Sequence, residues 1–189
     1  MNKWGLEQND IHWRYFLAIE DDLIRLARYI DLAESNYQTH SIECTRLLLA
    51  SCSEAEVVLK LASGLGRNRG MKDCFSALGE RSKILASSEI TIPRGGLVLR
   101  PWVDWTSTTL PFWWDAHNAV KHARSENVGK ANLKNMLDAV AGLFAALLIY
   151  LPGVGARAVM PAPLLLRADQ QLGSHDMSPE GAMVSFGDP

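Results

Sequence analysis

The sequence predicts an all-α protein: a four-helix up-down bundle with a short helix and a small β-hairpin inserted between the second and third long helices. Three observations support this fold class. Apolar residues recur at spacings of three and four in four long segments. Residues that favour helix starts and ends flank several of these segments. One β-prone stretch with proline and glycine at its centre interrupts the helical pattern.

The first two long helices are expected in the N-terminal third of the chain. The first is expected over 11–35, where the apolar residues with helical spacing are Phe16, Ile19, Leu23, Leu26 and Ile30. The second is expected over 41–63, with Ser41 as its N-cap and Gly64 just beyond its end. The apolar face of this second helix is wide, which is typical of a helix at the centre of a bundle.

The insertion follows the second helix. A short helix is expected over 71–78, and two short strands over 90–92 and 97–99 flank the turn residues of 93–96. An isolated two-stranded hairpin is marginally stable in water, so this one should pack against the bundle.

The remaining long helices precede a change in composition. The third is expected from Pro111 to about Arg124, and the fourth over 131–151. We therefore assign 1–152 to a helical bundle domain. The segment 153–189 is rich in glycine, proline and alanine and has no sustained period, so we predict a mostly disordered tail. Within it, 162–172 is a candidate for a helical turn or a short docking segment.

Composition limits the partners of the chain. The net charge is −2 over 189 residues, which excludes a strongly basic protein that coats nucleic acid through bulk charge. The three cysteines lack a C-x-x-C spacing, which indicates core residues in a reducing compartment. The longest apolar stretch, 139–154, is shorter than the roughly 20 residues that cross a bilayer. We expect a soluble cytoplasmic protein that has no membrane contact, metal or cofactor.

The segment WWDAHNAVKHAR, 113–124, carries the densest chemistry. On one continuous helix, Asn118, Lys121 and His122 share a stripe that begins at Trp114, and His117, Lys121 and Arg124 share an adjoining stripe. Imidazole exchanges protons near neutral pH, whereas lysine and arginine hold phosphate. RNA cleavage without a metal can take its nucleophile from the 2′-hydroxyl of the substrate. The protein then has to supply a general acid or base and a cation that holds the phosphate. The tryptophans serve either as core anchors or as surfaces that stack on bases.

The second helix carries two carboxylates, Glu54 and Glu56, in an apolar segment. Glu56 can pair with Lys60 on the solvent side, since four residues separate them. Alternatively, Glu54 or Glu56 points across the bundle and orients the cations of 121–124, because a buried carboxylate needs such a partner. His12 and His40 are isolated in the sequence and are not expected in a site.

The pattern W-x-x-x-N-x-x-K-H-x-R from Trp114 to Arg124, with SEAEVVLK in the preceding long helix, resembles HEPN-type domains. These are helical bundles common in prokaryotic defence and toxin–antitoxin systems, and the resemblance spans roughly 15–151. It implies a homodimer whose polar motifs face each other across a cleft. Many members are metal-independent endoribonucleases, and others bind RNA, nucleotides or a partner protein. The usual R-x4-6-H signature is replaced here by N-x-x-K-H-x-R, with arginine after histidine.

Two functions from different classes follow. As an endoribonuclease, the protein would use His122 as general acid or base, Lys121 and Arg124 to stabilise phosphate, and Asn118 to position it. Glu54 or Glu56 would orient the cations, and Trp114 and His117 would bind the substrate. The alternative is a non-catalytic accessory module that binds RNA, a nucleotide or a partner protein, with the polar cluster at its dimer seam.

Accessibility separates these two functions. Burial of Lys121 and His122 against a carboxylate would favour the accessory module, whereas a cleft that exposes both would favour the enzyme. A third hypothesis is a structural bundle whose tail recruits a partner.

Overall fold

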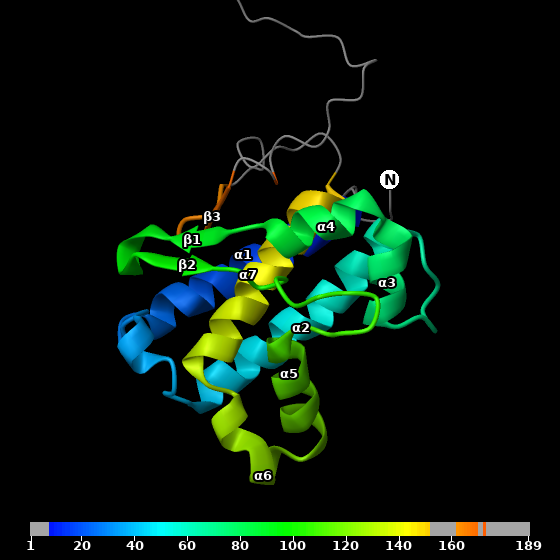
Figure 1. Cartoon of the computed structure of the whole chain (residues 1–189). Helices are drawn as coiled ribbons and strands as arrows, with labels where there is room; N and C mark the ends of the chain where they lie inside the picture. The colour runs from blue at the N-terminus through cyan, green and yellow to red at the C-terminus, as the bar shows by residue number, and fades with distance from the viewer. Residues whose placement is uncertain (1–7, 152–161, 170–171, 173–189) are drawn as a thin grey trace, which may run out of the picture.

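The computed structural model describes residues 8–151, 162–169 and 172. This part of the protein is mostly helical, with seven α-helices and one small antiparallel sheet (Figure 1). The longest helices are α1 (Gln8–Leu26), α2 (Ile42–Ser63), α5 (Phe112–His122) and α7 (Leu133–Tyr150). The shorter ones are α3 (Met71–Leu78), α4 (Glu80–Ser87) and α6 (Arg124–Asn127). The sheet contains β1 (Ile90–Ile92), β2 (Leu97–Leu99) and β3 (Arg167–Ala168) in the order β2-β1-β3.

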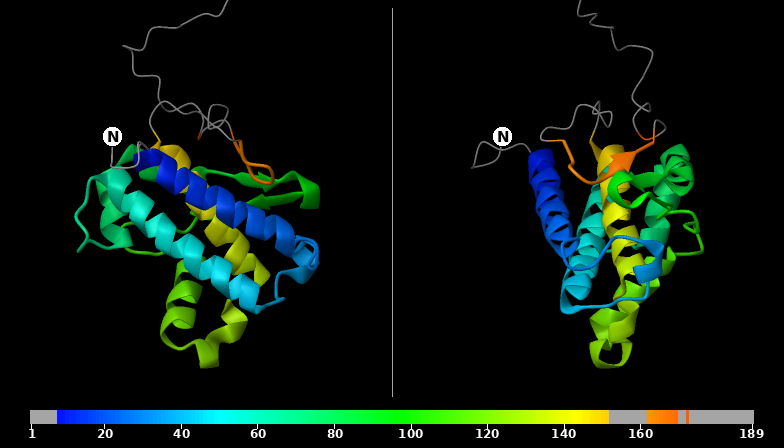
Figure 2. Two further views of the ribbon diagram at one scale, coloured as in Figure 1. Left: turned by 180° about the vertical axis from the view of Figure 1, so that it is seen from behind. Right: turned by 90° about the vertical axis from the view of Figure 1, so that its left-hand side faces the viewer.

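Helix α7 lies at the centre of the molecule, with α1 and α2 packed side by side along one side of it (Figure 2). Fifteen of its residues, from Leu133 to Ile149, are buried, which explains why its sequence is apolar nearly all round. By length and composition α7 could also cross a membrane, yet 83% of it is buried inside the protein. That burial is the ordinary behaviour of a core helix.

An aromatic cluster joins α5 to α7. The indole rings of Trp102 and Trp113 lie edge to face with their centroids 5.0 Å apart, and both side chains are fully buried. A Cβ atom at Gly142 of α7 would lie 2.9 Å from Trp113, so only glycine allows this approach. The indole N–H groups are satisfied, because Trp102 donates to the Gly142 carbonyl and Trp113 to the Pro101 carbonyl. Trp113 is therefore a core anchor.

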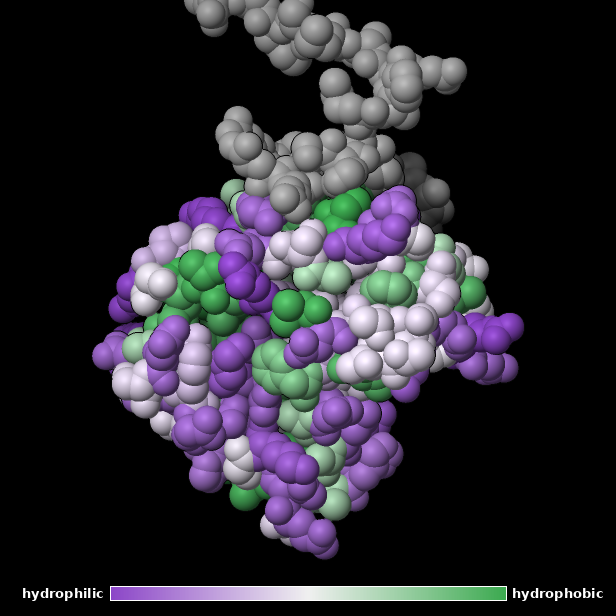
Figure 3. All heavy atoms as spheres, in the orientation of Figure 1, coloured by the Kyte–Doolittle hydropathy of each residue, from purple (hydrophilic) through white to green (hydrophobic). Residues whose placement is uncertain are grey.

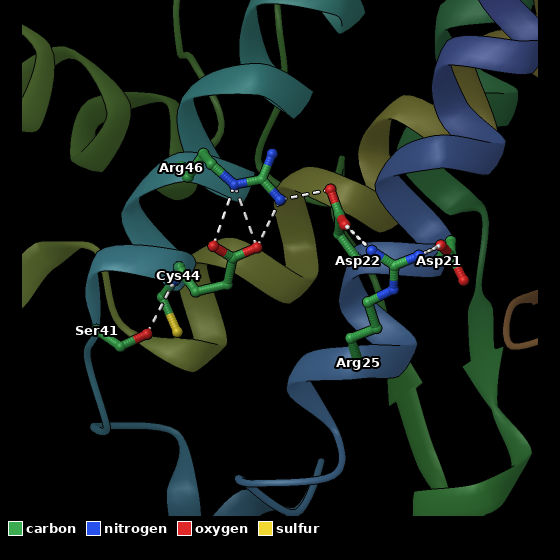
Figure 4. Close-up of polar contacts among 7 residues, drawn as sticks. Asp21, Asp22, Arg25, Ser41, Cys44 and Arg46 are labelled. Atoms are coloured by element: carbon green, nitrogen blue, oxygen red, sulfur yellow. Dashed lines mark hydrogen bonds and ion pairs between the residues drawn. The ribbon is translucent and has the colours of Figure 1, made fainter.

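Helix α2 begins where its sequence predicts. The Ser41 hydroxyl accepts a hydrogen bond from the Cys44 amide at 3.0 Å, which is the expected N-cap (Figure 4). One turn later, Arg46 pairs with Glu43 of α2 and with Asp22 of α1. Hydrogen bonds to Glu43 and then to Asp22 raise the pKa of Arg46, but its half-exposed side chain limits the contribution of this network to stability.

The first predicted helix is too long. Helix α1 ends at Leu26 rather than near residue 35, because the following chain makes tertiary contacts that a helix could not make. The carbonyls of Tyr37 and Thr39 accept hydrogen bonds from Lys134 and Leu133 at the start of α7. This loop therefore satisfies amides that a helix N-terminus leaves free.

The short helix at 71–78 and the hairpin at 90–99 are confirmed. The third and fourth long helices are confirmed near their predicted positions, although α5 stops at His122. Helix α4 was not predicted, nor was the third strand. The fold class is accordingly a mostly helical protein with a three-stranded sheet.

Within the segment 153–189, which we expect to be mostly disordered, residues 162–169 dock on the rest of the protein. Strand β3 pairs antiparallel with β1, with Ile90 opposite Ala168, and Leu165 and Leu166 are buried. These residues therefore form the short docking segment that was one of the two alternatives for 162–172. We call 162–169 the strap. The other residues of 153–189, apart from Leu172, lie outside the described part of the chain.

Glu20 of α1 holds the strap in place. Its carboxylate is only 2% exposed and accepts hydrogen bonds from the backbone amides of Leu164, Leu165 and Leu166 at 2.8 to 3.0 Å. Three charge-assisted hydrogen bonds compensate the cost of burying the charge. The sequence showed no sign of this role, because the partner amides are about 145 residues away along the chain.

Replacing Glu20 by glutamine should destabilise the protein. The remaining oxygen can still accept from Leu165 and Leu166 without the charge that strengthens these bonds, and the new NH2 group would face the Leu164 amide, which needs an acceptor. We expect the free energy of unfolding to fall by about 2–3 kcal/mol. Hydrogen exchange of the Leu165 and Leu166 amides should accelerate in Glu20→Gln. The matched control is Asp21→Asn, whose carboxylate is more than half exposed and, among the described residues, forms an ion pair with Arg25 alone. It should cost under about 0.5 kcal/mol. Equal effects of the two variants would contradict the role of Glu20.

Candidate functional site

An open hollow of about 550 Å³ lies between α2, α3 and α5. One face of α5 supplies four of its lining residues, which are spaced three and four apart: Trp114, His117, Asn118 and Lys121. Helix α2 contributes Glu56, the start of α3 contributes residues 70–73, and Leu110 closes the lining. Its size lies within the range of small-molecule sites. The surface over α5 and α6 is mainly hydrophilic (Figure 3).

The two tryptophans of the motif have different surroundings. Trp113 is fully buried in the aromatic cluster, whereas Trp114 borders the hollow and remains 6% exposed. The Trp114 ring lies 5.1 Å from the His117 imidazole, centroid to centroid. Trp114 therefore forms an apolar wall of the hollow and holds the imidazole in position.

His117 is the unusual group of the site. It is 4% exposed, and its Nδ1 atom has no hydrogen-bond partner in the described part of the chain. Burial, and then the positive charge of Lys121, lower the pKa of His117 below its usual 6.5, although a hydrogen bond with the Asn118 side chain offsets part of this effect. A buried N–H without an acceptor is rarer than a buried acceptor without a donor. The structure therefore favours a neutral imidazole with its proton on Nε2, which makes it a hydrogen-bond donor.

Lys121 and Asn118 border the same hollow. The Lys121 side chain is exposed, and it has no ion pair among the residues that the structure describes. A second lysine, Lys72 of α3, also lines the hollow. An unpaired ammonium, an amide and a neutral imidazole donor are groups that together can bind an anionic oxygen.

Of the two carboxylates, only Glu56 reaches the hollow. The Glu56 carboxylate lies 2.8 Å from the Lys60 ammonium, so Glu56 forms the ion pair with Lys60 that was the first of its two expected roles. The predicted orienting role of Glu54 is wrong: Glu54 contacts His12 of α1 at 2.5 Å. Two residues apart on a helix differ by about 200° in direction, so Glu54 and Glu56 face different neighbours. His12, which looks isolated in the sequence, thus has a partner 42 residues away.

His122 and Arg124 lie outside the lining of the hollow. His122 is the exposed last residue of α5, and Arg124 is the first residue of α6. Between them, Ala123 adopts a non-helical conformation with φ −145° and ψ 60°. The predicted stripe of His117, Lys121 and Arg124 is wrong, because it assumed one continuous helix through residue 124.

The predicted site is therefore only partly assembled. The hollow gathers the predicted Trp114, His117, Asn118, Lys121 and Glu56. The helix over 71–78 was predicted, but its start was not expected in the site, because no local signal in the sequence connects Gly70 and Lys72 with α5. Within the described residues, no group of three or more histidine, cysteine, aspartate or glutamate side chains could hold a metal ion.

Comparison with known proteins adds no family. No family model and no curated protein matches the chain, and no solved structure matches its fold.

The lowered pKa of His117 should make the stability of the protein depend on pH. In the unfolded chain the imidazole binds a proton more readily, so the contribution of His117 to stability is present above pH 6.5 and is lost as pH falls through the folded pKa. We expect the free energy of unfolding to fall less between pH 7.5 and pH 5 in His117→Gln than in the native protein. An NMR titration of His117 should give a midpoint below 6.5. A midpoint at or above this value would contradict the assignment.

Proposed function

We propose that the protein is a HEPN-like, dimeric cytoplasmic domain with a four-helix up-down core that binds RNA or a nucleotide at the α5 hollow. It would act as an accessory module of a prokaryotic defence or toxin-type system. One observation carries the binding proposal: Lys121, Asn118 and His117 border one open hollow, and Lys121 has no ion pair among the described residues.

Phosphate is the ligand group that these residues suit best. Lys121 and Lys72 supply positive charge, and the Asn118 amide, whose side chain also hydrogen-bonds His117, supplies a neutral donor. Trp114 and Leu110 add apolar surface beside them, which suits a nucleobase or sugar face. The overall charge of −2 means that this local arrangement, rather than bulk attraction, must supply the affinity.

The surroundings of the histidines favour binding over cleavage. A general base must accept a proton from a substrate hydroxyl, which requires a ring nitrogen within hydrogen-bond distance. Nδ1 of His117 is buried, and protonating it would create an N–H group without an acceptor. His122 is exposed but lies outside the hollow lining.

Binding should be measured with a labelled 12-nucleotide single-stranded RNA, by fluorescence anisotropy at low salt. Lys121→Met should weaken the affinity about tenfold, since it removes one charge-assisted contact worth about 1.4 kcal/mol. Lys130→Met is the matched control, because Lys130 is an exposed lysine outside the hollow, and it should change the affinity less than about twofold. Absence of RNA binding, or equal losses in both variants, would contradict the proposal.

A metal-independent endoribonuclease is the second candidate. It is favoured by the exposure of both Lys121 and His122 at the end of α5, where RNA could reach the His122 imidazole from the surface. Arg124 is exposed on α6 close by in the chain.

Cleavage of RNA by the purified protein in EDTA tests this candidate, with His122→Ala and His117→Ala assayed at equal concentration. If His122 is the acid or base, His122→Ala should lower the rate about 100-fold or more, whereas His117→Ala should retain most of it. The reverse pattern would assign proton transfer to His117 instead. Equal cleavage by all three proteins would indicate a contaminating nuclease and would exclude both histidines.

A further inference from the structure

The N-terminus of α3 opens into the same hollow as the α5 residues. Gly70 is its N-cap, and Met71, Lys72 and Asp73 form its first turn; all four residues line the hollow. The first bond back into the helix runs from the Cys74 amide to the Gly70 carbonyl. The amides before it have no intrahelical acceptor, and they give the helix start a partial positive charge.

We propose that the start of α3 and Lys121 together form a seat for a phosphomonoester, the terminal phosphate of a nucleotide or an RNA end. This inference rests on the proposed function and names the group that the hollow selects. Oriented amides at a helix N-terminus bind phosphate, and here a lysine of another helix borders the same space. The buried His117 imidazole lines the same space, and the Lys121 ammonium there has no ion pair among the described residues.

The charges around the hollow favour a dianion over a monoanion. Lys72 and Lys121 are both on its lining, and the charge of Glu56 is compensated by Lys60. Asp73 opposes an anion, but its carboxylate accepts the Gly70 amide at 3.0 Å. A terminal phosphate carries nearly two charges at neutral pH, whereas an internal phosphodiester carries one, so the lysines attract the terminal group more strongly. An end is also easier than a continuous strand to fit into a hollow of about 550 Å³.

Gly70 allows a test that leaves the rest of the hollow intact. A Cβ atom at Gly70 meets no heavy atom within 4 Å, and its φ of −96° suits any residue. In Gly70→Asp, the new carboxylate should cap α3 and occupy the amides that would hold phosphate. Gly70→Ala adds a methyl group without a charge or an acceptor and is the matched control.

The probes are 5′-AMP, 3′-AMP, adenosine and one RNA sequence with a phosphate at its 5′ end, at its 3′ end or at neither. We expect a phosphorylated probe to bind at least tenfold more tightly than its unphosphorylated counterpart. Gly70→Asp should abolish this preference without lowering the melting temperature, and Gly70→Ala should keep it within about twofold. Asp73→Asn should strengthen binding, since the amide oxygen can still accept from Gly70 while the repulsive charge is gone.

The outcomes separate this inference from the proposed function. Preference for AMP identifies a free nucleotide as the ligand, and preference for phosphorylated RNA identifies an RNA end. If RNA binds and Lys121→Met weakens it, but Gly70→Asp behaves like Gly70→Ala, the phosphate seat is overturned and the proposed function stands. If AMP shows the phosphate preference but RNA does not bind, RNA recognition falls and the seat stands. If none of the probes binds, both are overturned.

Discussion

The contact of Trp113 with Gly142 determines the position of the candidate site. Trp113 is fully buried, and the absence of a side chain at Gly142 lets its indole ring approach the α7 backbone. This contact fixes which side of α5 faces the core. Because a helix advances by about 100° per residue, the side that carries Trp114, His117, Asn118 and Lys121 is centred about 90° around the helix from Trp113, and there it borders α2 and α3.

Helix α2 shows how one segment can serve two environments. Glu54 faces α1 and contacts His12, whose ring also lies edge to face with Tyr150 at 5.8 Å. Glu56 borders the hollow and is held by Lys60. Between these two directions, residues such as Ala55 and Val58 are fully buried. The pairing of each carboxylate with its own cation or imidazole leaves Lys121 without an acidic partner among the described residues, which keeps this lysine available for a ligand.

Local sequence patterns predicted where most helices lie. The features that they did not predict depend on contacts between residues far apart in the sequence. The period of apolar residues located α2, α5 and α7, and Ser41 identified the start of α2, because these signals lie within a few residues of one another. The end of α1 and the docking of the strap depend on Glu20 and on the carbonyls of Tyr37 and Thr39, whose partners are far away in the sequence. In the site, helical spacing correctly joined Asn118 with Lys121. It failed for Arg124, because Ala123 breaks the helix.

Two of the buried polar groups that lack a full set of partners, Asp138 and His117, lie close to α5. Asp138 of α7 is fully buried, and burial raises its pKa to about 6, although Lys134 offsets part of this effect. The Lys134 ammonium in turn lies 4.8 Å from the ring of Phe112, the first residue of α5. Asp138 thus has a cation that reduces its cost, whereas the buried Nδ1 of His117 has no compensating group in the described structure. An unpaired buried acceptor costs about 1–3 kcal/mol, so the native fold tolerates this cost at His117 in exchange for placing the imidazole beside the hollow and the unpaired Lys121.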